Sequence, residues 1–200
     1  NLSFRSIHTK GANVPPLYVW PLRPRDSSVL MHQMRGRSFE PAIALGVARR
    51  CRWGMPQVLL CVPLFRGKPF PTTFWLSCPF LAMMCSQMEA LGGIKQLEEF
   101  MKDNADDRDW LDFNVEHALL RLALLSRGER RYLQKARKGM MDRLRLSGVG
   151  GIARRSGFNV KCLHLQVASW LALRKHPAES WLKERLSTVE CEEPDRFCIN

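Results

Sequence analysis

The sequence lacks the motifs that mark the common enzyme classes. It contains no Gly-x-Ser-x-Gly elbow for a serine nucleophile, no Walker loop for a nucleotide phosphate and no dinucleotide-binding fingerprint. The glycine-rich run at residues 148–151 has no predicted strand before it and no Lys-Ser/Thr pair after it, so we interpret it as a flexible connector. The sequence therefore names no reaction.

Closely spaced cysteine pairs are also absent. The seven cysteines are scattered over 200 residues, and none has a C-x-x-C partner. Secreted mini-proteins instead carry dense and even sets of cysteines that form disulfides. Because no charged-then-apolar signal pattern opens the chain either, we expect reduced thiols and a cytoplasmic location.

Acidic residues are few relative to basic ones. The chain has 19 Asp and Glu against 31 Lys and Arg, a formal net charge of +12, which makes polyanions its natural partners. Hydrophobic residues at 46% and charged residues at 25% are typical of a globular protein. A chain of 200 residues is one domain by length, and it can bury a core without disulfides.

One long stretch carries no charge, residues 69–88, which is 20 residues and enough to span a bilayer. Prolines stand at its start and in its middle, with several Ser and Thr residues between them. We interpret it as a short buried strand followed by a helix, and we expect no membrane span.

The first 30 residues differ from the rest. Four prolines interrupt them and no apolar period survives, so we interpret residues 1–30 as a disordered leader, or as read-through ahead of Met31, and leave them out of the fold. We expect a single domain at residues 31–190 and a tail at 191–200.

The order of elements within that domain predicts an α+β fold, a small antiparallel sheet of about three strands covered by about five helices. Short apolar runs predict strands at residues 42–49, 57–65 and 70–77, and the turn at Gly67 predicts that the last two form a hairpin. Apolar periodicity predicts helices at residues 79–91, 94–102, 106–138, 160–174 and 178–186. Pro79 and the Gly92-Gly93 pair bound the first of these helices.

Three cysteines fall at predicted element ends. Cys51 lies in a turn after the first strand, Cys78 at the start of one helix and Cys162 on the first turn of another. The partial positive charge of a helix N-terminus lowers the pKa of a thiol, and Lys161 acts on Cys162 in the same direction.

A candidate metal site follows from these thiols and the histidine two residues after Cys162. Thiolate and imidazole together suit zinc, and a mostly cysteine set also suits an iron–sulfur cluster. We therefore predict a metal site formed by Cys51, Cys78, Cys162 and His164.

The competing interpretation treats the cysteines as small buried hydrophobic side chains, because their intervals match no standard metal template. We expect this of Cys61 and Cys85, which lie within apolar stripes. Cys191 and Cys198 lie in the polar tail. The sequence leaves open whether each is a metal ligand, a disulfide partner or neither.

Four motifs occur in an order that resembles a known family. They are Arg50-Cys51 with Gly54 and Pro56, then Phe70-Pro71-Thr72-Thr73-Phe74-Trp75-Leu76-Ser77-Cys78-Pro79, Leu91-Gly92, and Val160-Lys161-Cys162-Leu163-His164. The chain is similar, over residues 31–186, to the bacterial domain-of-unknown-function family five hundred and one. The resemblance implies no activity, but it singles out the same four candidate ligands. Trp53 and the leader depart from the pattern.

A thiol-dependent enzyme is an alternative function, with Cys162 as nucleophile and His164 as base. Residues i and i+2 of a regular helix point about 200° apart, so the two side chains meet only if the first turn is irregular.

Polyanion binding is a further alternative, with RNA or polyphosphate as the partner. Residues 127–161 hold eleven basic and two acidic residues, a net charge of +9. Four of the basic residues recur at spacings of three and four, which predicts one basic helix face that can follow a phosphate backbone. The competing interpretation is a solvated helix face. The predicted binding residues are Arg127, Arg131, Lys135, Lys138, Arg154, Arg155 and Lys161. We favour a non-catalytic metal-binding protein over both alternatives.

Overall fold

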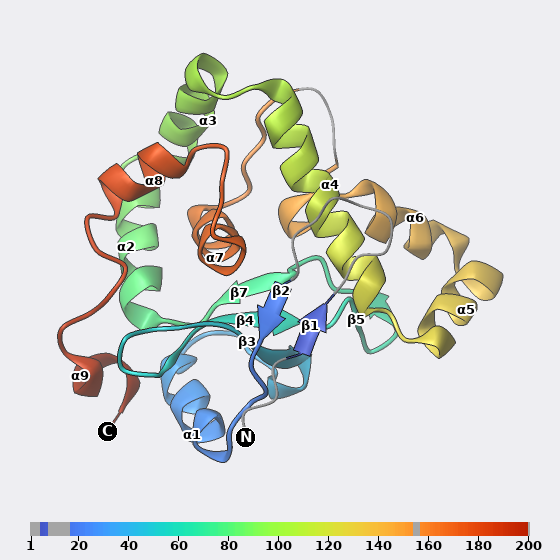
Figure 1. Ribbon diagram of the computed structural model, residues 1–200, viewed down its shortest axis with the longest axis horizontal. Coiled ribbons are helices and arrows are strands. Elements are labelled where there is room, and N and C mark those ends of the chain that lie inside the picture. Colours follow the sequence, from blue (N-terminus) through green and yellow to red (C-terminus); the bar gives the residue numbers. More distant parts are fainter. Residues whose placement is uncertain (1–4, 8–16, 154–156, 200) are drawn as a thin grey trace.

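The computed structural model describes residues 5–7, 17–153 and 157–199, and it confirms the α+β class (Figure 1). The described residues form nine α-helices, more and shorter ones than the sequence predicts: α1 Pro24–Gln33, α2 Pro79–Ala90, α3 Gly93–Asn104, α4 Asp107–Leu124, α5 Arg127–Ala136, α6 Lys138–Leu146, α7 Leu163–Leu173, α8 Glu179–Arg185 and α9 Pro194–Cys198. The 3-10 helices are η1 Pro41–Ile43 and η2 Val149–Gly151. The strands are β1 Arg5–Ile7, β2 Leu17–Val19, β3 Ala44–Arg50, β4 Pro56–Cys61, β5 Leu64–Phe65, β6 Lys68–Pro69 and β7 Phe74–Leu76.

The central sheet is antiparallel and has the order β3-β4-β7. β4 and β7 pair as the predicted hairpin, with Leu59 opposite Trp75. The connection between them contains the small β5–β6 hairpin, whose turn places Gly67 at a φ of 72°, a conformation that glycine adopts readily. The predicted strand pairing is therefore confirmed, although the strands are shorter than expected.

Both faces of the sheet are covered, and β4 shows this best because all of its residues are buried. Val58 and Leu60 join the main core, whereas Leu59 belongs to a second core with Leu30 and Met34, at the end of α1. Successive residues of a strand point to opposite faces. Because both faces of β4 are buried, its sequence is a nearly continuous apolar run rather than an alternating pattern.

Helix α7 is the centre of the main core. It appears nearly end-on in Figure 1, with α2, α3 and α8 around it. Eight of its residues are buried: Leu163, Gln166, Val167, Ala168, Ser169, Trp170, Leu171 and Ala172. A helix that is apolar on all sides belongs inside a core.

The uncharged stretch at residues 69–88 divides as predicted, into β7 and the first part of α2, with Pro79 as the first helical residue. Among the residues that the structure describes, no helix has the length and apolar character needed to cross a bilayer.

Part of the segment that the sequence analysis leaves out of the fold is structured. Residues 17–30 contribute β2 and most of α1. Asp26 of α1 forms a buried ion pair with Arg50, at 2.7 Å between Oδ2 and NH2. Burial alone raises the pKa of Asp26, but the hydrogen bonds from Arg50 and Arg23 outweigh it and hold that pKa below its usual value. Helix α1 is thereby tied to the end of β3.

The single helix predicted over residues 106–138 is wrong, because the chain forms α4, α5 and part of α6 there. Ser126 precedes α5 and forms a capping box with Glu129. The Ser126 hydroxyl accepts from the Glu129 N–H, and the Glu129 carboxylate accepts from the Ser126 N–H. A second break follows at Arg137.

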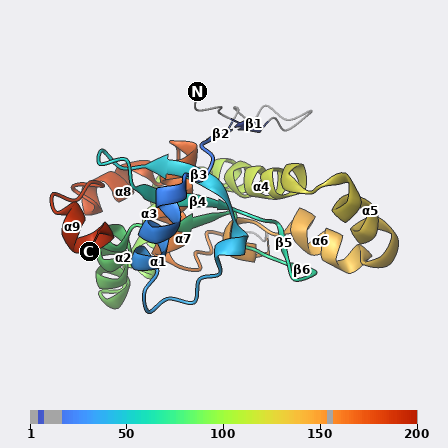
Figure 2. The same ribbon diagram turned by 90° about the horizontal axis from the view of Figure 1, so that it is seen from below.

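Helices α5 and α6, residues 127–146, form an arm. Figures 1 and 2 both place the arm at the opposite end of the molecule from α9. Leu133 and Leu144 of the arm are buried in a small core together with Leu125, which directly follows α4.

The glycine-rich run at residues 148–151 is packed, so its interpretation as a flexible connector is wrong. Val149 and Gly150 are buried in η2, and the Val149 N–H donates to Asn114 Oδ1 at 3.0 Å. A Cβ atom on Gly148 would stand 1.9 Å from the same Asn114 oxygen, so this close approach requires glycine.

Candidate functional site

The candidate site lies at the N-terminus of α7, where two carboxylates hold the chain. Glu89, near the end of α2, accepts a hydrogen bond from the Leu163 N–H at 2.5 Å. Glu98 of α3 accepts from the Val160 N–H at 2.8 Å. These bonds satisfy backbone donors that precede or begin the helix. The two carboxylates also place negative charge at the positive end of the helix dipole, where it is stabilising.

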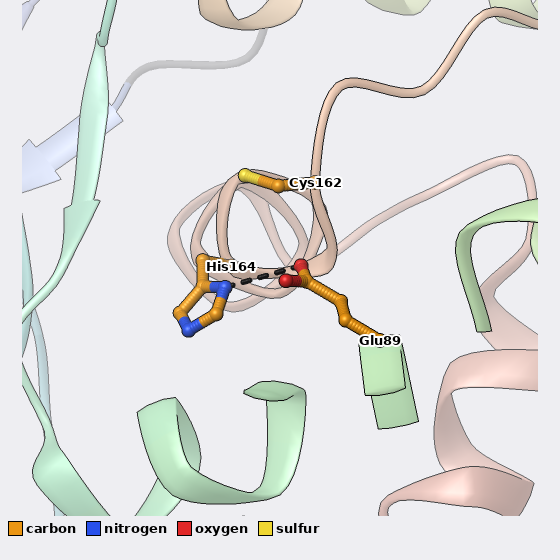
Figure 3. A group of neighbouring side chains, drawn as sticks. All are labelled: Glu89, Cys162 and His164. Atoms are coloured by element: carbon orange, nitrogen blue, oxygen red, sulfur yellow. Dashed lines mark hydrogen bonds and ion pairs between the residues drawn. The ribbon is translucent and has the colours of Figure 1, made fainter. Parts of the chain in front are cut away.

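Glu89, Cys162 and His164 form a group whose ligand atoms all lie within 4.8 Å of one another (Figure 3). Cys162 is the N-cap of α7 and has an extended backbone, with φ −162° and ψ 156°. Because this backbone is extended, the side chain of Cys162 does not follow the helical rotation. The first turn is thus irregular, as a contact between Cys162 and His164 requires.

The imidazole of His164 is fixed on both sides. Its Nε2 lies 3.1 Å from the carbonyl oxygen of Ala82, which only accepts, so Nε2 carries a proton. Its Nδ1 lies 3.1 Å from Glu89 Oε1. Nδ1 holds a proton when it donates to Glu89, and it offers a lone pair when it binds a metal.

The predicted lowering of thiol pKa values at helix N-termini is wrong for both Cys162 and Cys78. Burial raises the pKa of Cys162, and the charge of Glu89 adds to this, against the N–H groups of Leu165 and His164 and the charge of Lys161. Burial raises the pKa of Cys78 to about 12. The cost of burying a thiolate exceeds the gain from the helix terminus at both sites.

Cys51 and Cys78 lie at element ends as predicted, but outside this group. Cys51 follows β3 in a turn closed by a bond from its N–H to the Met55 carbonyl, and Cys78 is the N-cap of α2. Cys61 and Cys85 are core residues as expected, 1% and 0% exposed. Of the four ligands predicted from the sequence, the structure brings together Cys162 and His164. The four-ligand set itself stays a prediction.

Glu89 is the member of the group that sequence reasoning does not find. It lies 75 positions from His164 and ends a predicted amphipathic helix, where a charged residue is typical of a solvated face. No local spacing relates it to Cys162, so only the packing of α2 against α7 reveals it.

The predicted polyanion-binding residues divide in a similar way. Arg127, Arg131 and Lys135 are exposed on α5, but Lys138 is exposed on α6, so the four do not share one helix. None of these four forms an ion pair with another described residue. Lys161 is exposed beside Cys162, while residues 154 and 155 lie outside the described part of the chain.

Comparison with known proteins gives one match. The family model described as protein of unknown function, DUF501, matches residues 47–184, which confirms the resemblance seen in the sequence motifs. Neither the curated proteins nor the solved structures contain a significant match.

Proposed function

Since the chain belongs to the DUF501 family, whose description is that of a protein of unknown function, we propose its function from the site itself: the chain binds a zinc ion through Glu89, Cys162 and His164. The observation that carries this proposal is the group of one carboxylate, one thiol and one imidazole atom within 4.8 Å.

The mixture of donors favours zinc over other common metals. Zinc accepts oxygen, nitrogen and sulfur ligands, whereas calcium and magnesium prefer oxygen and iron–sulfur clusters are held mainly by thiolates. Three protein ligands leave one tetrahedral position open. The side chains of His164 and Glu89 are 26% and 24% exposed, so solvent reaches the residues that would hold the ion. A bound zinc ion lowers the pKa of a water in the open position, which is the chemistry of hydrolysis.

The surroundings of His164 support metal binding. Histidines that bind metals usually donate their other ring N–H to a carbonyl or carboxylate, which fixes the tautomer. The Ala82 carbonyl fills that role and leaves Nδ1 facing Glu89. Binding would then replace the direct contact between His164 Nδ1 and Glu89 and release the thiol proton of Cys162.

Thiol catalysis is less favoured on the same observations. A nucleophilic cysteine needs a lowered pKa or a base that takes its proton, whereas burial and Glu89 raise the pKa of Cys162. The imidazole is already engaged by Glu89 and Ala82. A zinc ion would remove the thiol proton outright, so the raised pKa does not oppose metal binding.

Metal content tests the proposal. We expect protein purified without chelators to contain zinc at this site, and His164→Ala to lose one zinc equivalent. Glu89→Gln retains an oxygen that accepts from the Leu163 N–H but removes the charge, so it separates helix capping from metal binding. We expect it to weaken zinc binding at least tenfold with an unchanged circular dichroism spectrum.

The matched control is His32→Ala, which removes a histidine of α1 outside the group and should leave the zinc content unchanged. Equal zinc content in the wild type, His164→Ala and Glu89→Gln would show that Glu89 only caps α7 and that neither residue holds zinc.

A second candidate function is polyanion binding by the arm. The observation that favours it is a set of four exposed basic side chains that form no ion pair with described residues: Arg127, Arg131, Lys135 and Lys138. We expect RNA and polyphosphate to bind with an affinity that falls steeply with salt. Arg131→Glu with Lys135→Glu should abolish binding, and Arg35→Glu with Lys102→Glu, which changes the net charge equally elsewhere, should not. Equal binding by both double variants would reject the arm as the interface.

A further inference from the structure

Four cysteines outside the proposed zinc site belong to segments that meet at the other end of α2. Cys51 follows β3, Cys78 precedes α2, and Cys191 and Cys198 belong to the C-terminal segment. Three of the four are buried, with Cys78, Cys191 and Cys198 at 4%, 6% and 4% exposure.

The start of β4 is the point at which these segments meet. The Pro56 carbonyl accepts from Gln33 Nε2 at 2.9 Å and from Ser77 Oγ at 3.1 Å. The Gln57 carbonyl accepts from the Cys78 N–H at 3.2 Å. The Gln57 side chain donates to the Val189 carbonyl at 2.6 Å, which brings the C-terminal segment to the same place.

Contacts next to the cysteines hold this segment against the body. The Cys191 carbonyl accepts at 2.9 Å from Nε1 of Trp53, a residue that lies two positions after Cys51. The ring of Phe197 packs edge-on against Phe80, two residues after Cys78, with centroids 5.6 Å apart. The C-terminal segment is thereby held against the stretches of the family-matched part of the chain that contain Cys51 and Cys78.

The four thiols are electrostatic neighbours. Burial is the main cause that raises the pKa of Cys78, and the thiols of Cys198 and Cys191 raise it further. Burial likewise raises the pKa of Cys191 and Cys198, and Cys51 adds to the rise in both. The hydrogen bonds around the start of β4 therefore bring together the segments that carry all four cysteines.

Two polar side chains nearby complement negative charge on the sulfurs. Gln33 Nε2 donates to Cys198 Sγ at 3.2 Å, the kind of N–H···S bond that stabilises a thiolate. The half-buried guanidinium of Arg37 lies near Cys85 and Cys78 and over the ring of Trp75, 5.7 Å from its centroid, and its NH1 has no hydrogen-bond partner among the described residues.

We propose that Cys51, Cys78, Cys191 and Cys198 form a tetrathiolate metal centre that is distinct from the proposed zinc site. Four thiolates in one place suit zinc or an iron–sulfur cluster. Filled, the centre would clamp the C-terminal segment onto the starts of β4 and α2. Metal binding would release the proton of each thiol.

The side chains must rotate to close the centre. Among the described residues, only Glu89, Cys162 and His164 form a group of three or more ligand atoms within 4.8 Å, so the four sulfurs stand wider apart than zinc ligands do. A change of one staggered χ1 rotamer moves a cysteine sulfur by about 3 Å, which leaves the backbone positions in place.

Metal and sulfide analysis of the full chain, purified without air, tests the proposal. We expect the double variant Cys191→Ser with Cys198→Ser to lose one metal centre and to retain the zinc at Glu89, Cys162 and His164. Colourless protein that loses zinc identifies zinc as the occupant. Brown protein that loses iron and acid-labile sulfide identifies a cluster. The control Cys61→Ala removes a buried core cysteine of β4 and should change neither.

A second measurement avoids the need for variants that fold. In the wild-type protein, we expect the four thiols to resist alkylation under native conditions and to react at least tenfold faster after a chelator is added. Unchanged metal content in the double variant, or native alkylation rates that a chelator does not alter, would overturn the proposal. A disulfide between Cys191 and Cys198 in protein kept under reducing conditions would overturn it as well. The two proposed sites share no residue, and His164→Ala leaves all four cysteines intact. If one proposal fails, the other can therefore still be tested.

Discussion

The body of the molecule and the arm differ in both composition and packing. All seven cysteines, all six tryptophans and all five histidines lie outside residues 127–146, whereas the arm holds eight basic and two acidic residues. The main core of the body is one continuous cluster around α7, and the arm core has three buried leucines. The difference places the proposed metal ligands in the body, with its continuous core, and positive charge on an extension with a small core.

One buried side chain links the two regions. Arg121 of α4, 1% exposed, donates through NH1 to the Gly148 carbonyl at 2.8 Å and through NH2 to the Ser147 carbonyl. These acceptors follow the last turn of α6, where backbone carbonyls lack helical partners. A guanidinium has enough donors to satisfy several of them, so the end of the arm is anchored by hydrogen bonds.

The largest expected effect is a loss of stability of the body at low pH, because the buried histidines lie in the body and the arm has none. Two histidines of the body are buried and neutral: His117 donates from Nδ1 to the Phe113 carbonyl and has Nε2 2.9 Å from Ser169 Oγ, and His176 Nε2 lies 2.9 Å from Gln166 Oε1. Burial lowers the pKa of each to about 3.

Between pH 6.5 and pH 3 the unfolded chain therefore binds protons that the native state does not, and stability falls as the pH falls. Each histidine contributes a slope of about 1.4 kcal/mol per pH unit, so unfolding monitored by tryptophan fluorescence should lose roughly 5 kcal/mol from pH 6.5 to pH 4.5. His117→Gln should halve this slope. An unchanged slope would assign the pH dependence to other groups.

The next effect comes from the centre of the sheet. Leu60 on β4 is 1% exposed and belongs to the main core. Leu60→Ala removes its buried methyl groups and leaves a cavity, and it should lower the free energy of unfolding by about 2–5 kcal/mol. Urea titration with fluorescence and circular dichroism should show both signals shifting together, since the body unfolds as one unit. Separate shifts would show that β4 is not part of one cooperative core.

The same substitution in the arm sharpens the comparison. Leu133 of α5 is 0% exposed, yet its cluster has only two other buried members. Leu133→Ala should unfold α5 and α6 locally and lower helical circular dichroism, while the tryptophan transition moves by less than about 1 kcal/mol. The six tryptophans report only on the body, which makes the two signals separable. A fluorescence shift as large as that of Leu60→Ala would show that arm and body fold together.

The sequence predicts features that depend on local patterns. Proline at the start of α2 and the apolar run of β4 each leave a signal within a few residues, and both predictions are confirmed. The Ser126-Arg127-Gly128-Glu129 stretch also fits the capping-box pattern, so the break before α5 was readable although periodicity alone predicts one long helix.

The candidate sites depend on contacts between distant segments, which explains what the sequence does not predict. Glu89 reaches Leu163 and His164 only because α2 packs on α7. Cys198 reaches Gln33 across 165 positions. The pKa error at Cys162 has the same origin, since the helix terminus is a local property and burial is a property of the whole fold.

The smallest expected effect tests the capping box that separates arm from body. In Ser126→Ala the Glu129 N–H loses its acceptor at 3.2 Å, and the Glu129 carboxylate retains the bond from the backbone N–H of residue 126. Loss of an N-cap costs about 1 kcal/mol, and the cost should fall on the arm alone, as faster amide exchange in α5 with an unchanged tryptophan transition. Ser126→Asp restores the acceptor and should restore the slow exchange. Equal exchange rates in the wild type and Ser126→Ala would mean that packing against α4, rather than the cap, fixes where α5 begins.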